Sequence, residues 1–143
     1  MQLQQRNKYL ETTVQTASPA QLLIMLYDGA IRFCRQGIEA IEQQRPSDAN
    51  TYLLKTQDII SEFIITLDRS NPMSEQLLSL YEYFNQRLVE ANTKKSAEPA
   101  REVLQHLIEL KETWMQAAKQ TNAQAGHANG NGSSPKAYQS TVV

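Results

Sequence analysis

Three scarcities in the amino-acid sequence limit what this chain can be. It has one cysteine, Cys34, which can close no disulfide within the chain and cannot hold a metal ion alone. None of its five glycines lies between residues 38 and 125. The longest apolar run, at 22–27, is too short to span a membrane, and the N-terminus lacks the apolar core of a signal peptide. These features predict a cytosolic protein with a buried, reduced thiol.

An excess of charge of one sign is also missing. The chain carries 14 Lys and Arg against 15 Asp and Glu over 143 residues, and its basic residues are scattered rather than clustered. Binding to nucleic acid or to an anionic membrane relies on a concentrated positive field. We therefore expect neither nucleic acid nor a membrane among the partners.

The residue types of catalytic and metal sites are sparse. The two histidines, His106 and His127, have no partner at metal-ligand spacing, and the chain contains no HExxH motif, phosphate-binding glycine loop or nucleophile elbow. We expect no metal, no cofactor and no enzymatic activity. One enzyme-like alternative stays open, because a helical bundle with a single helical histidine is the form of a histidine phosphotransfer module. In that case His106 would carry the phosphate.

Helix signals recur along the chain, whereas the alternating pattern of strands is absent. Residues 18–21, Ser-Pro-Ala-Gln, combine a serine cap, a proline at the first helical position and a glutamine three residues after the cap. Prolines and polar breaks then divide the rest of the chain. The pattern predicts helices at about 19–44, 48–68, 74–92 and 98–119, the second capped by Ser47 or Asp48.

Four helices joined by short breaks favour an all-α fold, an antiparallel up-and-down four-helix bundle over residues 18–120. Residues 1–17 are polar with scattered apolar side chains, and we expect them to form a short N-terminal arm. From Thr121 the composition turns rich in Gly, Asn and Ser, which predicts a disordered C-terminal tail over 121–143.

The helix predicted at 19–44 carries more apolar side chains than one packing seam needs. Turning each residue by about 100° confines its polar residues to an arc of about 120°. The rest of its surface holds two stripes side by side. The first comprises Leu22, Leu26, Gly29, Ala30, Phe33, Gly37 and Ala40, and the second comprises Leu23, Tyr27, Ile31, Cys34, Ile38 and Ile41. The later helices each show one main seam. These seams comprise Leu53, Ile60, Phe63 and Leu67 on the second helix, Leu77, Tyr81, Phe84, Leu88 and Ala91 on the third, and Val103, Leu107, Leu110, Trp114 and Ala117 on the fourth.

Two interpretations of this surplus stay open. In one, the helix lies centrally and contacts two neighbours. In the other, the second stripe faces an apolar groove that waits for a partner helix. On the following helix, Leu54 and Ile65 lie among polar residues and would add to such a groove. The second interpretation therefore assigns a partner-binding groove to Tyr27, Ile31, Ile38, Leu54 and Ile65, with Tyr9, Leu10 and Val14 of the arm folding back to shield it.

Four blocks of sequence, one on each predicted helix, form a recognisable set. The first runs from Tyr9 through Ser18-Pro19 to the residues Met25-Leu-Tyr-Asp-Gly-Ala30. Later blocks are Lys55-Thr-Gln-Asp-Ile-Ile60, Leu80-Tyr-Glu-Tyr-Phe84 with Arg87-Leu-Val-Glu-Ala-Asn92, and Thr113-Trp114. In this order the blocks resemble the FliS family of bacterial flagellar export chaperones, and the resemblance covers about residues 5–120.

The resemblance implies a cytosolic, non-catalytic bundle that binds the C-terminal segment of newly made flagellin in apolar grooves and prevents premature polymerisation. It also implies delivery to the export gate, the cytoplasmic domain of FlhA, with docking through the arm position matched by Tyr9. Other flagellar regulators would be further partners, and members of the family are monomeric or dimeric. An alternative from another class stays open: a structural or regulatory bundle whose spare apolar face forms a homodimer.

Overall fold

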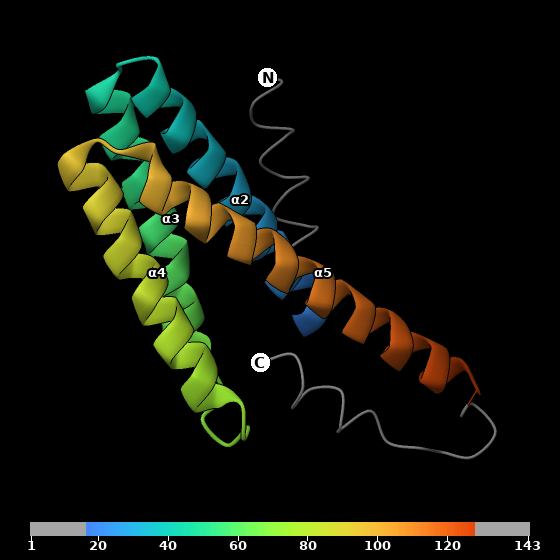
Figure 1. The fold of residues 1–143 in the computed structure, drawn as a ribbon. Helices are drawn as coiled ribbons and strands as arrows, with labels where there is room; N and C mark the ends of the chain where they lie inside the picture. Colours follow the sequence, from blue (N-terminus) through green and yellow to red (C-terminus); the bar gives the residue numbers. More distant parts are fainter. Residues whose placement is uncertain (1–16, 128–143) are drawn as a thin grey trace, which may run out of the picture.

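The computed structural model describes the backbone of residues 17–127 and the burial of the side chains of residues 17–120. Four helices make up this part of the chain. They are α2 (Pro19–Glu42), α3 (Pro46–Thr66), α4 (Ser74–Lys94) and α5 (Ala97–His127). Residues 17–127 contain no strand. Figure 1 shows the helices packed as a bundle, with consecutive helices running in opposite directions. The predicted all-α bundle is confirmed.

Helix α2 begins where the capping box predicts. The backbone N–H of Gln21 donates to Oγ of Ser18 at 3.2 Å, and the side chain of Gln21 accepts from the N–H of Ser18 at 2.9 Å. Pro19 occupies the first turn, where its missing N–H costs nothing. The helix ends at Glu42, and Gln44 follows with a left-handed φ of 57°. The chain therefore turns before Pro46, two residues earlier than predicted.

The predicted cap of the next helix was wrong. Helix α3 starts at Pro46, its cap position is Arg45, and no side chain forms a capping hydrogen bond there. Proline at the first helical position fixes the φ angle that a helix requires, so the helix starts before Ser47 and Asp48 rather than after them. Arg45 instead pairs with Asp48 at 2.7 Å.

Helix α5 is the longest of the four and runs past the other helices at one end of the bundle (Figure 1). It extends to His127, beyond the end predicted at about 119, so the predicted tail begins too early for residues 121–127. Thr121 to Ala125 include no proline or glycine, and a helix that is already formed continues through such residues at little cost. Residues 128–143 of the predicted tail, and residues 1–16 of the predicted arm, lie outside the described residues.

The four extensive helix interfaces join α2 to α3, α3 to α4, α4 to α5, and α2 to α5. Each helix therefore packs mainly against two neighbours around one core. The predicted seams of the second and third helices face this core. The buried residues are Leu53, Ile60 and Phe63 on α3, Leu67 directly after it, and Leu77, Tyr81, Phe84, Leu88 and Ala91 on α4. On α5 the buried side chains Val103, Leu107 and Trp114 belong to its predicted seam.

Both apolar stripes of α2 are used by neighbouring helices. The second stripe contains most of the large buried side chains, such as Tyr27 and Cys34, and the thiol of Cys34 donates to the carbonyl oxygen of Ala100 on α5 at 3.4 Å. The first stripe faces α3, where a Cβ on Gly37 would lie 2.8 Å from Cδ2 of Leu53. Helix α2 therefore carries two apolar stripes because it packs between α3 and α5. This is the first of the two interpretations of its sequence.

Candidate interaction surface

The large apolar side chains left exposed mark where this bundle has unused packing surface. Within residues 17–120, these are Leu54, Ile65, Met73, Tyr83, Val89 and Met115, each at least 39% exposed. Ile65, at 75%, is the most exposed of them. Four of the six lie on the two adjacent helices α3 and α4. Tyr83 bonds to Glu102 on α5, which leaves Leu54, Ile65 and Val89.

The register of α3 against α4 brings these three side chains to one face. Asn92 on α4 donates to the side chain of Asn50 on α3 at 2.8 Å, which aligns the antiparallel helices. Counting from that pair in helical steps puts Leu54 near Val89, and Ile65 near the partly exposed Leu78. Between the two apolar pairs lie Gln57 and Ser61 on α3 and Asn85 on α4. We call this surface the α3–α4 face.

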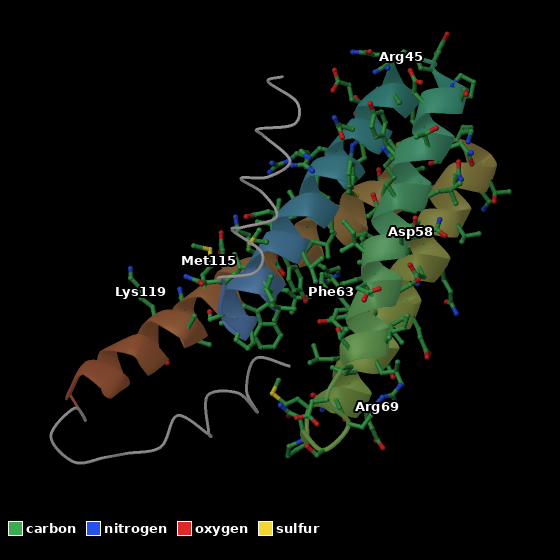
Figure 2. All side chains as sticks on the ribbon, turned by 180° about the vertical axis from the view of Figure 1, so that it is seen from behind. Arg45, Asp58, Phe63, Arg69, Met115 and Lys119 are labelled. Carbon is green, nitrogen blue, oxygen red and sulfur yellow. The ribbon has the colours of Figure 1, made fainter. Side chains whose placement is uncertain are left out.

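The α3–α4 face is rich in exposed carboxylates, which come from both helices. The nearest cations on the two helices have other contacts, since the ammonium of Lys55 lies over the Phe33 and Tyr52 rings and Arg87 pairs with Glu90 and Glu102. Figure 2 shows Asp58 on the outer side of α3, with α4 beside it. None of these carboxylates forms an ion pair within the part of the chain that the structure describes. They are Asp58, Glu62, Glu75 and Glu82.

Between α2 and α5 lie shallow depressions with apolar floors and charged rims. Ile31, Ile108 and Met115 line one of them, and Ile38 and Leu104 line the next. Two ion pairs bridge the helices beside them. Asp28 pairs with Lys111 at 2.5 Å, and Glu42 pairs with Arg101 at 3.2 Å.

The predicted groove residues divide between core and surface. Tyr27 is fully buried, its ring stacks on Phe63 at 4.5 Å, and its hydroxyl lies 2.7 Å from that of Tyr81. The assignment of Tyr27 to a partner-binding groove was therefore wrong, because this side chain is part of the bundle core. Ile31 and Ile38, each 7% exposed, form the floor of the α2–α5 depressions and offer a partner little area.

Leu54 and Ile65 are exposed as their sequence surroundings indicate, at 45% and 75%. The sequence interpretation overlooked Val89 and Leu78, which complete the same face. The signal was present, since Val89 lies about 100° from the buried Leu88 and falls outside the α4 seam. The exposure of Val89 was not predicted, because this residue directly follows Leu88 of the seam in the sequence.

Polar side chains close the seam between α4 and α5. Arg87 pairs with Glu102 at 3.2 Å and also with Glu90, while the hydroxyl of Tyr83 donates to Glu102. The hydrogen bond from Tyr83, followed by the charge of Arg87, lowers the pKa of Glu102 against partial desolvation. These contacts hold the two helices together.

An aromatic pair on α2 and α3 is flanked by cations. Phe33 and Tyr52 stack with centroids 6.5 Å apart, and the ammonium of Lys55 lies 5.3 Å from the Phe33 ring. The guanidinium of Arg32 lies 5.0 Å from the same ring. Both cations therefore lie within the range of a cation–π attraction to the Phe33 ring.

His106, the residue of the phosphotransfer alternative, stacks on Phe84 at a centroid distance of 5.7 Å and is partly buried. Among the described residues no group of three His, Cys, Asp or Glu side chains is placed to hold a metal ion. The helices in that part are also too short or too polar to cross a membrane.

The chain is similar to known proteins over most of its length. A family model described as flagellar protein FliS matches residues 2–121, which include the whole of α2, α3 and α4 and most of α5. The chain belongs to the FliS family. The match covers both helices of the α3–α4 face and the depressions between α2 and α5.

Curated FliS-family proteins from distant bacteria agree with the family model. The chain is 34% identical over 122 residues to the flagellar secretion chaperone FliS of Bacillus subtilis, covering 85% of this chain and 91% of that protein. It is 32% identical over 107 residues to FliSB of Pseudomonas aeruginosa, covering 73% and 85%. For FliS of Salmonella typhimurium the identity is 29% over 118 residues, covering 80% and 87%.

Proposed function

We propose that this FliS-family chain is a cytosolic flagellar secretion chaperone that binds the C-terminal segment of flagellin and keeps it from polymerising before export. It then delivers flagellin to the cytoplasmic domain of the export-gate protein FlhA. The observation that carries the proposal is the family match over residues 2–121, together with curated relatives named as flagellar secretion chaperones. The role requires no catalysis.

The exposed apolar surface supports a binding role. Ile65 and Val89 are at least half exposed, and Leu54 nearly so. A client segment that is unfolded when free loses conformational entropy when it folds on the chaperone, so it needs apolar area to offset that cost. The bundle's own core is already closed by four helix interfaces, so these side chains remain available to a partner.

We assign client contact first to Leu54 and Ile65, with Ile31 and Ile38 contributing only at the floor of the α2–α5 depressions. Tyr9, Leu10 and Val14 of the predicted arm lie outside the described residues. We propose that the arm shields apolar surface in the free chain and that Tyr9 takes part in docking at the export gate.

Calorimetric titration with a flagellin C-terminal peptide tests the proposal. We expect one-to-one binding with a large negative heat-capacity change, the mark of apolar burial. Leu54→Glu and Ile65→Glu should each weaken binding at least about tenfold. Gln76→Glu, an equal charge change on another side of α4, should leave binding unchanged. Thermal unfolding of all three variants should match the parent chain. Absence of binding by the parent chain would refute the proposal.

A homodimer built on the same exposed side chains is the second candidate, and the exposure of Ile65 favours it equally. Sedimentation distinguishes the two. A stable dimer that flagellin peptide does not dissociate supports the structural role, whereas a monomer that forms a one-to-one complex supports the chaperone.

A further inference from the structure

Helices α4 and α5 meet most closely near the turn that joins them. There Arg87 pairs with Glu102 at 3.2 Å, and the rings of Phe84 and His106 stack 5.7 Å apart. Towards their opposite ends the two helices diverge (Figure 1). The facing sides of α4 and α5 therefore have less of each other to pack against in this half of the bundle.

The facing sides of α4 and α5 can be followed into the diverging half by helical steps. Seven residues turn a helix through about 700°, which returns to within about 20° of the same side. Leu80 lies seven positions before Arg87, and Thr113 lies seven positions after His106, so both belong to the facing sides. We call the residues there the diverging surface, which comprises Met73 at the cap position of α4, Gln76 and Leu80 on α4, and Leu110 and Thr113 on α5.

The diverging surface is uncharged and partly open to solvent. Met73 is 47% exposed, and Leu80 and Leu110 are half-buried. The other surfaces with apolar side chains differ, because charged residues rim the α2–α5 depressions and carboxylates lie on the α3–α4 face. A charged side chain placed on the diverging surface would lose hydration without meeting an opposite charge there. The best occupant is therefore apolar and free of charge.

One segment of the chain outside the described residues has this character. Residues 137–143 contain no charged side chain, and their large apolar residues are Tyr138, Val142 and Val143. Residues 1–16 also lie outside the described part but include charged side chains of both signs, namely Arg6, Lys8 and Glu11. Of the two segments, 137–143 matches the diverging surface.

The chain after α5 is long enough to bring this segment back to the bundle. From His127, where α5 ends, back to Thr113 is fourteen residues of helix, or about 21 Å. Eleven residues separate His127 from Tyr138, and an extended chain of that length spans up to about 36 Å. Tyr138 can therefore lie level with Thr113, at the open end of the diverging surface.

We propose that residues 137–143 dock on the diverging surface of the same chain. Tyr138 lies against Met73, and the two valines that follow lie against Leu80 and Leu110. The contact needs little intrinsic affinity, because a short tether holds the segment at an effective concentration of about millimolar. Any partner that uses this surface must first displace the segment. The contact does not depend on the proposed function, whose client contacts lie mainly on the α3–α4 face.

A nitroxide label on the full chain tests the contact. The substitution Gln139→Cys provides the attachment point, while Cys34 is fully buried and does not react. In the methyl NMR spectrum we expect the label to broaden the signals of Met73, Leu80 and Leu110 and to leave those of the α3–α4 face sharp. The broadening should persist as salt is raised, because no charge holds the segment.

Further substitutions in the labelled chain test which side chains hold the segment. The double variant Tyr138→Ser/Val142→Ser should abolish the broadening, and it changes no residue of the four helices. Met73→Glu should weaken the broadening, whereas Gln86→Glu, which adds the same charge to the outer side of α4, should not. Thermal unfolding checks that each variant keeps the bundle. Broadening that survives the double variant, or responds equally to the two glutamates, would overturn the proposal.

Three other results would also overturn it. The first is the absence of broadening from the diverging surface. The second is broadening of Ile31 and Ile38 instead, which would assign the segment to the α2–α5 depressions. The third is broadening that passes from a labelled chain to a separate, isotope-enriched chain, which would assign the segment to a second copy. Titration with the flagellin peptide is a separate measurement, so the proposed function can fail or stand without changing these outcomes.

Discussion

The hydroxyl groups of Tyr27 on α2 and Tyr81 on α4 lie 2.7 Å apart, buried in the bundle core. They belong to helices that are not among the extensive helix interfaces, so the contact joins opposite sides of the bundle. Phe63 on the inner side of α3 stacks on Tyr27 at 4.5 Å and lies 5.2 Å from Tyr81 (Figure 2). A hydrogen bond between two otherwise apolar seams fixes how the helices meet.

Removing one hydroxyl of this pair should destabilise the bundle. Tyr27→Phe leaves the hydroxyl of Tyr81 buried without its partner, and Tyr81→Phe does the reverse, so each should lower the free energy of unfolding by about 1–3 kcal/mol. The double variant should cost less than the sum, because neither hydroxyl is left without the other. Urea unfolding of the four proteins gives the coupling, and additive effects would show that the hydroxyls do not stabilise one another.

The buried thiol of Cys34 should make the bundle sensitive to alkali. Burial raises the pKa of Cys34 from 9.0 to about 12, against the opposing charge of Arg35. Above about pH 9 the unfolded chain loses this proton while the folded chain keeps it, so stability falls as pH rises towards 12. Between about pH 8 and pH 10 the thiol should account for a loss of about 1.4 kcal/mol.

The variant Cys34→Ala isolates that contribution. Its free energy of unfolding should fall less than that of the parent chain over the same pH range, by about 1.4 kcal/mol. Tyr27 and Tyr81, whose pKa values burial also raises, are common to both proteins and cancel in the difference. Parallel pH profiles would show that the thiol is not protected by the fold.

Two glycines of α2 should respond oppositely to alanine. A Cβ at Gly37 would meet Cδ2 and Cγ of Leu53 at 2.8 and 3.0 Å, so Gly37→Ala should force the helices apart and cost about 1–3 kcal/mol. A Cβ at Gly29 would meet Cδ1 of Ile59 at 3.3 Å, the movable end of a side chain. Gly29→Ala should be neutral or stabilising by up to about 1 kcal/mol, because alanine favours helix. Thermal unfolding compares them, and an equal loss in both would contradict the close approach at Gly37.

The capping box of α2 should contribute measurably to stability. Ser18→Ala removes the side-chain oxygen that accepts from the N–H of Gln21 and should cost about 0.5–2 kcal/mol. Ser47→Ala is the matched control, since Ser47 lies in the first turn of α3 without capping it, and it should change stability by less than about 0.5 kcal/mol. Equal losses of stability in the two variants would show that the hydrogen bond from Gln21 to Ser18 does not stabilise the start of α2.

Sequence reasoning succeeded where one local rule decides the outcome. The box at Ser18 and Gln21 starts α2 as predicted, because its two hydrogen bonds involve residues three apart. The α4 seam was also predictable, since a single apolar stripe on a helix has one core to face. For α3, the proline rule alone would have placed the start at Pro46, and the competing cap signals at Ser47 and Asp48 misled the prediction.

The candidate site was harder to predict, because burial depends on partners that no local pattern names. Tyr27 lies in an apolar stripe that fits either a core or a groove, and only the packing of α2 between α3 and α5 assigns it to the core. Leu54 and Ile65 were recognisable because polar neighbours surround them. Leu78 and Val89 join them only through the register between α3 and α4, which is a tertiary property.

The interface between α2 and α5 has a consequence for how the chain folds during synthesis. The other three extensive interfaces join consecutive helices, whereas this one joins the first described helix to the last. Cys34 and its acceptor Ala100 are separated by 66 positions along the chain. A nascent chain that has released only α2, α3 and α4 therefore leaves the α2 stripe uncovered on one side. The bundle closes only when the ribosome has released α5, so the core between α2 and α5 forms only after all four described helices have been made.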